Sequence, residues 1–196
     1  MIPPFAEALG HAFAGAGGRP LAQAATVSPS GLPEVRTVVL RGLGPEADAW
    51  FASDARSHKF RSLTTTPWLE LCLFDAAAGV QWRLRGRVSV HKDDALARRV
   101  WSELPPVTRQ GFFSPPPGAP VARTAGDASA PVAGPWRAAG ADRGEAPAIR
   151  PAEPPATFAV VRLPPARCDR LVLGPPLLRR RWTLEGGAWK REDLVP

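Results

Sequence analysis

The sequence predicts a mainly β protein, an antiparallel β-barrel with small peripheral helices. Short apolar runs with strand-like character recur along the chain, turn signals separate them, and helical patterns are few and short. The chain has 196 residues, of which 44% are hydrophobic and 22% charged, so it is long enough to bury a core. We therefore expect one domain spanning residues 1–196.

The N-terminal part begins with a short amphipathic helix. Phe5, Leu9 and Phe13 recur every four positions in 3–13, and a glycine cluster follows them. After the glycines, four apolar runs bounded by turn residues read as strands: 21–27, 35–41, 48–53 and 68–75.

The clearest strand spans 80–91, where apolar and polar side chains alternate. The residues expected on the core side are Val80, Trp82, Leu84, Val88 and Val90. Asp93 then offers a helix N-cap, and a helix with an apolar stripe should run to the stop at Pro105-Pro106.

Composition changes between about residues 115 and 156, where ten of the 24 prolines fall among many glycines and alanines. Such a stretch has too little apolar surface to offset its ordering entropy, so we expect a long surface loop or linker. Strand patterns resume afterwards at 157–163, 170–173, 181–184 and around Trp189. These strands should rejoin the same sheet.

Charge and cysteine content narrow the function classes. The chain carries 25 Lys plus Arg against 18 Asp plus Glu, but its arginines are scattered, which disfavours a nucleic-acid-binding protein. Arginine also binds phosphate and carboxylate, so an anionic small ligand fits the charge equally well.

Cys72 lies in an apolar run and Cys168 is the only other cysteine, so a metal site or disulfide framework is not expected. With no long apolar segment in the sequence, we expect a cytoplasmic protein without a membrane partner.

One candidate ligand site lies where a strand is followed by a helix. Ser57 stands at the expected N-cap, with Arg56, His58 and Lys59 around it. A helix N-terminus presents unpaired N–H groups and partial positive charge, so these residues could cradle a phosphate. Taken alone, the pattern fits a simple capped helix with solvated basic residues better.

Two other segments have a polar residue in a position suited to a ligand. Arg36 and Arg41 flank an apolar strand, and strict alternation would put them on opposite faces, so a shared ligand would need a twist or bulge. Gln81 starts the 80–91 strand on its polar face and could hydrogen-bond a heteroaromatic ring. For each, an ordinary surface role is the more frequent alternative.

The order of these segments resembles the pyridoxamine 5'-phosphate oxidase family. Five motifs follow one another as in that family: Arg36-Thr-Val-Val-Leu-Arg41, Phe51-Ala-Ser53-Asp54, Ser57-His58-Lys59, Thr66-Pro67 and Gln81-Trp-Arg-Leu-Arg-Gly86. The end of the chain, from Arg181-Trp182 to the final Leu194-Val195-Pro196, is similar to the family's C-terminal signature. The resemblance covers about residues 20–105 and 157–196.

The resemblance implies an FMN-binding split barrel that forms a homodimer with FMN at the subunit interface. By matching positions, Arg36, Ser57, His58 and Lys59 would hold the FMN phosphate. The residues that would lie near the rest of the cofactor are Arg41, Ser53, Gln81 and Arg181. No residue is matched to a catalytic acid or base.

The substrate positions depart from the family pattern. The family's phosphate-binding residues for pyridoxal compounds are replaced by Glu103-Leu104 and by Leu177, and the chain contains no tyrosine. We therefore expect an FMN-binding oxidoreductase with an altered substrate site. The alternatives are a non-catalytic flavin- or haem-binding module and a deazaflavin-dependent reductase.

Overall fold

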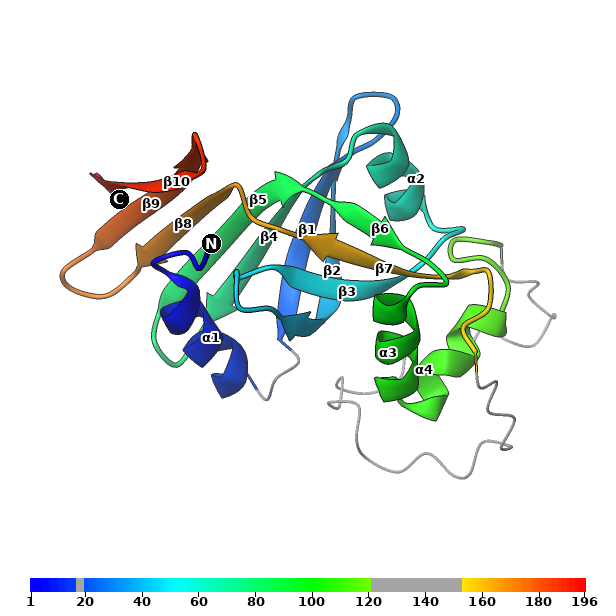
Figure 1. Ribbon diagram of the computed structural model, residues 1–196. Coiled ribbons are helices and arrows are strands. Elements are labelled where there is room, and N and C mark those ends of the chain that lie inside the picture. Colours follow the sequence, from blue (N-terminus) through cyan, green and yellow to red (C-terminus); the bar gives the residue numbers. More distant parts are fainter. Residues whose placement is uncertain (17–19, 121–152) are drawn as a thin grey trace, which may run out of the picture.

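The computed structural model describes residues 1–16, 20–120 and 153–196 (Figure 1). Within these described residues, ten strands form one antiparallel sheet that curls into a half-barrel, which confirms the predicted mainly β fold class. The strands are β1 (Leu21–Val27), β2 (Pro33–Leu43), β3 (Ala49–Asp54), β4 (Trp68–Asp75), β5 (Val80–Arg87), β6 (Ser89–His91), β7 (Phe158–Leu163), β8 (Arg167–Val172), β9 (Leu178–Glu185) and β10 (Ala188–Leu194). They lie in the order β10-β9-β8-β5-β4-β1-β2-β3-β7-β6.

Four helices surround the sheet: α1 (Ala6–Gly15), α2 (His58–Thr65), α3 (Ala95–Glu103) and α4 (Pro106–Gln110), the last followed by a 3-10 turn at Gly111–Phe113. None of the helices in the described part of the chain is long and apolar enough to cross a membrane.

The main core fills the inside of the curl. Alternate residues of β4 and β5 are buried there, with Leu71 and Leu84 completely covered. The residue before α1, Phe5, packs against Trp182 of β9 and Trp189 of β10, with ring centroids 5.4 and 5.1 Å apart. The start of the chain is thereby fixed to its C-terminal hairpin.

A second, smaller core lies between α3 and β7. Trp101 of α3 is fully buried and makes edge contacts with Phe158 of β7 at 5.0 Å and with Phe112 at 5.8 Å. The sequence did not predict α4 or the 3-10 turn that carries Phe112. Pro106 begins α4, because proline fits the first helical turn, where no N–H donor is needed.

The predicted bounds were most accurate for strands that have a turn at each end. The observed β1 and β4 coincide with the predicted 21–27 and 68–75. β8 and β9 each begin three residues earlier than predicted, because Arg167 and Arg179 continue the backbone pairing between these two strands.

The prediction of one continuous strand over 80–91 is wrong. The chain pairs with β4 and β8 as β5, breaks at Val88, and then pairs with β7 as β6. At Gly86 the chain between β7 and β8 crosses so closely that an added Cβ would lie 2.2 Å from the carbonyl oxygen of Pro164. After this crossing, the strand turns to a new partner, and Val90 is 37% exposed instead of facing the core.

The predicted N-cap Asp93 is also wrong by one residue. Asp93 has a φ of 51°, which turns the chain, and Asp94 caps α3 by accepting a hydrogen bond from the N–H of Ala97 at 2.9 Å. The other carboxylate oxygen of Asp94 binds Nδ1 of His91 at 2.7 Å. This contact ties β6 to the start of α3.

Most of the predicted Pro-rich loop, residues 121–152, lies outside the described residues. The described chain on either side of it is held together at Thr157. The hydroxyl of Thr157 donates to the carbonyl of Phe112 at 2.8 Å, and its own carbonyl accepts from the N–H of Ala55 at 2.8 Å. The chain therefore leaves and re-enters the fold at neighbouring points.

Candidate functional site

The start of α2 is organised by its own side chains. As predicted, Ser57 is the N-cap: its hydroxyl accepts from the N–H of Phe60 at 3.4 Å and donates to the carbonyl of Asp54 at 2.7 Å. Arg56 donates to both carboxylate oxygens of Asp54, from Nε at 3.0 Å and from Nη2 at 2.7 Å. Burial acts to raise the pKa of Asp54, but the hydrogen bonds from Arg56 outweigh it and lower that pKa. Arg56 is therefore engaged by Asp54.

Lys59 and Arg36 form the centre of the candidate site. Lys59 is half-buried, and its ammonium has no hydrogen-bond or ion-pair partner among the described residues. Burial lowers the pKa of Lys59, and the positive charge of Arg36 lowers it further, whereas Asp54 acts in the opposite direction. Two neighbouring cations that disfavour each other are suited to binding an anion of more than one negative charge.

Arg36 is held in place by the chain around it. Its Nη1 donates to the hydroxyl of Thr26 at 2.6 Å and to the carbonyl of Ala24 at 3.2 Å. Its Nη2 donates to the carboxylate of Glu34 at 2.8 Å. The guanidinium is thereby fixed near the start of β2, against β1.

Two other residues of the predicted cofactor site, Ser53 and His58, lie at the same turn. Ser53 is buried at the end of β3, with its hydroxyl 3.4 Å from the carbonyl of Asp54. His58 is exposed on the first turn of α2, and an added Cβ on Gly118 would lie 3.8 Å from its ring. The structure thus brings Ser53, Ser57, His58 and Lys59 together where β3 leads into α2.

The remaining predicted residues lie elsewhere on the sheet. Arg41 stands at a register shift between Leu40 and Gly42 in the pairing of β2 with β3. Such a bulge is one of the irregularities that would allow Arg36 and Arg41 to face one ligand. In the strand order, Gln81 on β5 and Arg181 on β9 are separated from β2 by further strands.

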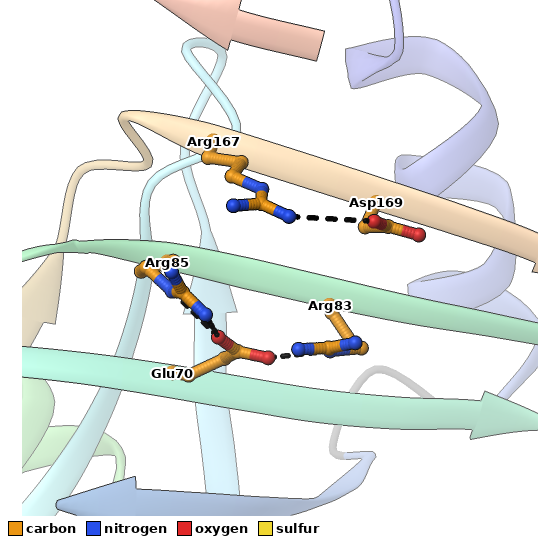
Figure 2. A pocket seen from close by; sticks show the side chains of 5 residues that line it. All are labelled: Glu70, Arg83, Arg85, Arg167 and Asp169. Carbon is orange, nitrogen blue, oxygen red and sulfur yellow. Dashed lines mark hydrogen bonds and ion pairs between the residues drawn. The ribbon is translucent and has the colours of Figure 1, made fainter. Parts of the chain in front are cut away.

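A charged cluster that the sequence did not predict lies on the outer face of β4, β5, β8 and β9, and Figure 2 shows its members from β4, β5 and β8. Glu70 lies between Arg83 and Arg85 and forms an ion pair with each. Asp169 pairs with Arg179 at 3.0 Å, with Arg181 at 3.3 Å and with Arg167 at 3.8 Å. Five arginines thus face two carboxylates, and this face has excess positive charge.

Burial and neighbouring charges shift the pKa values of several residues in this cluster. Burial acts to raise the pKa values of Glu70 and Asp169, but their arginine partners outweigh burial and lower both. Burial and the neighbouring charges of Arg181 and Arg85 lower the pKa of Arg167. The only signal for this cluster in the sequence was the alternation of arginine in 83–87, because its other members come from distant strands.

The N-terminal half of the chain is similar in sequence to known proteins. Residues 3–92 match the family model described as the FMN-binding domain of pyridoxamine 5'-phosphate oxidase. Pyridoxine/pyridoxamine 5'-phosphate oxidase 2 of Arabidopsis thaliana is 30% identical over 106 residues, which cover 50% of this chain and 54% of the relative. The chain thus spans about half the length of this curated relative.

Two solved structures are similar over the whole chain. A pyridoxamine 5'-phosphate oxidase-related, FMN binding protein from Nostoc punctiforme PCC 73102 has a TM-score of 0.80 and 26% identity, with 100% of both chains covered. PhzG from Burkholderia lata 383, solved in complex with tetrahydrophenazine-1-carboxylic acid, has a TM-score of 0.72 and 18% identity, covering 100% of this chain and 98% of PhzG. The second similarity supports the fold alone. Together these findings confirm the predicted resemblance and the FMN cofactor.

Proposed function

We propose that the chain, whose residues 3–92 match the FMN-binding domain model of the pyridoxamine 5'-phosphate oxidase family, is an FMN-dependent oxidoreductase with an altered substrate site. The observation that carries the cofactor assignment is the pair Arg36 and Lys59. Lys59 has a lowered pKa and lacks an anionic contact partner in the described chain, which fits the donor set that a phosphate needs.

The proposed roles follow from position. Arg36, Ser57, His58 and Lys59 hold the phosphate, and Ser53 supports the turn that carries them. Arg41, Gln81 and Arg181 lie near the isoalloxazine ring. Bound FMN supplies hydride transfer at its ring, whereas these side chains supply anchoring, orientation and electrostatic tuning.

We propose that two copies of the chain share each FMN. Arg181 on β9 is separated from β2 by β8, β5, β4 and β1. At the usual spacing of neighbouring strands the path along the curled sheet is about 24 Å, which favours one FMN contacting Arg36 of one protomer and Arg181 of the other. The outer face also exposes large apolar side chains, including Val35 at 66% and Trp68 at 47%, which a second copy would cover.

The dimer is tested by light scattering on the purified protein at micromolar concentration, with and without FMN. The expected mass is about twice the 20.9 kDa of the chain in both cases, because the apolar face is present without the cofactor. A mass of one chain in both conditions would contradict the shared site.

Activity is tested by anaerobic mixing of the FMN-loaded protein with electron donors while the flavin absorbance is followed. We expect bleaching by a nicotinamide donor and none by pyridoxamine phosphate. The positions that hold a substrate phosphate in the family are here Glu103, the buried Leu104 and the exposed Leu177. A carboxylate repels a phosphate and leucine donates no hydrogen bond to it, so the anchoring energy of that substrate is lost.

The alternatives give different results in the same experiment. Rapid bleaching by pyridoxamine phosphate would refute the altered substrate site. A flavin that no donor reduces would favour a non-catalytic binding module. The absorption spectrum of the protein as purified separates FMN from haem and from a deazaflavin.

A further inference from the structure

An anion-binding site does not require a carboxylate, yet the candidate phosphate site contains one. Glu34 precedes Arg36 by two residues on β2, and its Oε2 accepts a hydrogen bond from Nη2 of Arg36 at 2.8 Å. The same oxygen accepts from the hydroxyl of Ser62 on α2 at 3.1 Å. Ser62 is buried, so the carboxylate is held between β2 and α2 beside Arg36.

This contact limits what Arg36 can offer to another anion. Its Nη1 is engaged by Thr26 and Ala24, and Glu34 uses its Nη2. Among the described residues, Glu34 is the only carboxylate in an ion pair with Arg36. Glu34 therefore balances the positive charge of Arg36 within their ion pair, whereas no ion-pair partner of Lys59 is found among the described residues.

We propose that Glu34 is a resident counter-ion of the cofactor phosphate site, which sets how tightly FMN is held. The proposal rests on the assignment of Arg36 and Lys59 to the phosphate. When the phosphate binds, Glu34 either gives up its contact with Arg36 or shares that cation with a second anion. The first alternative loses an ion pair. The second brings two anions close to one cation, where they repel each other. Glu34 thus weakens FMN binding and makes the cofactor exchangeable.

The test compares FMN and riboflavin binding to the wild-type chain and to Glu34→Gln, by quenching of flavin fluorescence. Glutamine keeps an oxygen that can accept from Arg36 and Ser62, so we expect the fold to be preserved, as circular dichroism would verify. The dissociation constant for FMN should fall about tenfold or more, and FMN release should slow, because one like charge is removed near the phosphate. Riboflavin has no phosphate, so its affinity should not change.

Glu185→Gln is the matched control. Glu185 is exposed on β9, where it pairs with Lys190 at 2.7 Å, and its substitution changes the net charge of the chain by the same amount. This variant should bind FMN as the wild type does. An equal gain in both variants would show a general charge effect and overturn the proposal.

A third variant, Lys59→Ala, separates failure of the proposal from failure of the site assignment. If Lys59→Ala weakens FMN binding while Glu34→Gln leaves it unchanged or weakens it, the phosphate site stands and the counter-ion role is overturned. If the wild type binds FMN and riboflavin equally, the site assignment itself fails and the counter-ion role fails with it.

Discussion

Replacing Arg36 and Lys59 together by alanine is expected to weaken FMN binding by a factor of about one hundred or more while the fold remains. Hydrogen bonds to charged groups contribute about 1.5–3 kcal/mol each, and the double substitution removes two such donors from a phosphate. Titration with FMN and with riboflavin measures the effect. The wild type should bind riboflavin far more weakly than FMN, and the double variant should lose most of this difference.

The matched control is Arg180→Ala with Lys190→Ala. Both residues form exposed ion pairs on β9 and β10, with Asp193 and Glu185, and the pair of substitutions changes the net charge equally. This control should retain FMN. Normal FMN binding by the Arg36 and Lys59 variant, with an unchanged circular dichroism spectrum, would mean that the phosphate lies elsewhere.

The second large effect is expected at Asp169, which anchors the arginines on the outer face of the sheet. Asp169 is only 4% exposed and pairs with Arg167, Arg179 and Arg181. Asp169→Asn keeps the shape but leaves three guanidinium groups without their shared anion. Breaking a buried ion pair costs about 3–5 kcal/mol, so the thermal midpoint should fall by roughly 10 °C.

The pH dependence of this effect has a defined sign. Burial acts to raise the pKa of Asp169, but Arg179 and Arg181 outweigh it and lower the pKa below its ordinary value of 3.8. The stability that the carboxylate contributes is therefore complete above pH 4 and is lost as the pH falls through the lowered pKa. The thermal midpoints of the wild type and of Asp169→Asn should differ most at neutral pH and should converge in strong acid.

Asp193→Asn provides the comparison for Asp169→Asn. Asp193 also pairs with two arginines, but on the exposed surface of β10, where ion pairs contribute little. The thermal midpoint of Asp193→Asn should stay close to that of the wild type. Equal losses in the two variants would contradict the argument that burial makes Asp169 important.

Local patterns were sufficient to predict most elements and one part of the candidate site. Alternation and flanking turns identified β1 and β4, and the helix-start signal identified the Ser57 cap. The break at Val88 was missed because it depends on how closely the chain at Pro164 passes Gly86, which lies far away in sequence.

The polar contacts were harder to predict than the backbone. Glu34 is only two residues from Arg36, but the partners that hold them, Ser62 and Thr26, come from other elements. The cluster around Asp169 depends on the register between β8 and β9, which a sequence pattern does not specify. Candidate residue types were therefore visible in the sequence, whereas their partners required the fold.

The junction at Thr157 bears on how the length of this chain can vary. Hydrogen bonds from Thr157 to Phe112 and from Ala55 to Thr157 hold the two sides of the 121–152 segment next to each other. Closing a loop between fixed neighbouring points costs little for added length, about 0.6 kcal/mol for each doubling. We therefore expect an insertion between residues 121 and 152 to leave the thermal midpoint nearly unchanged, because the contacts of Thr157 with Phe112 and Ala55 hold the described chain in place.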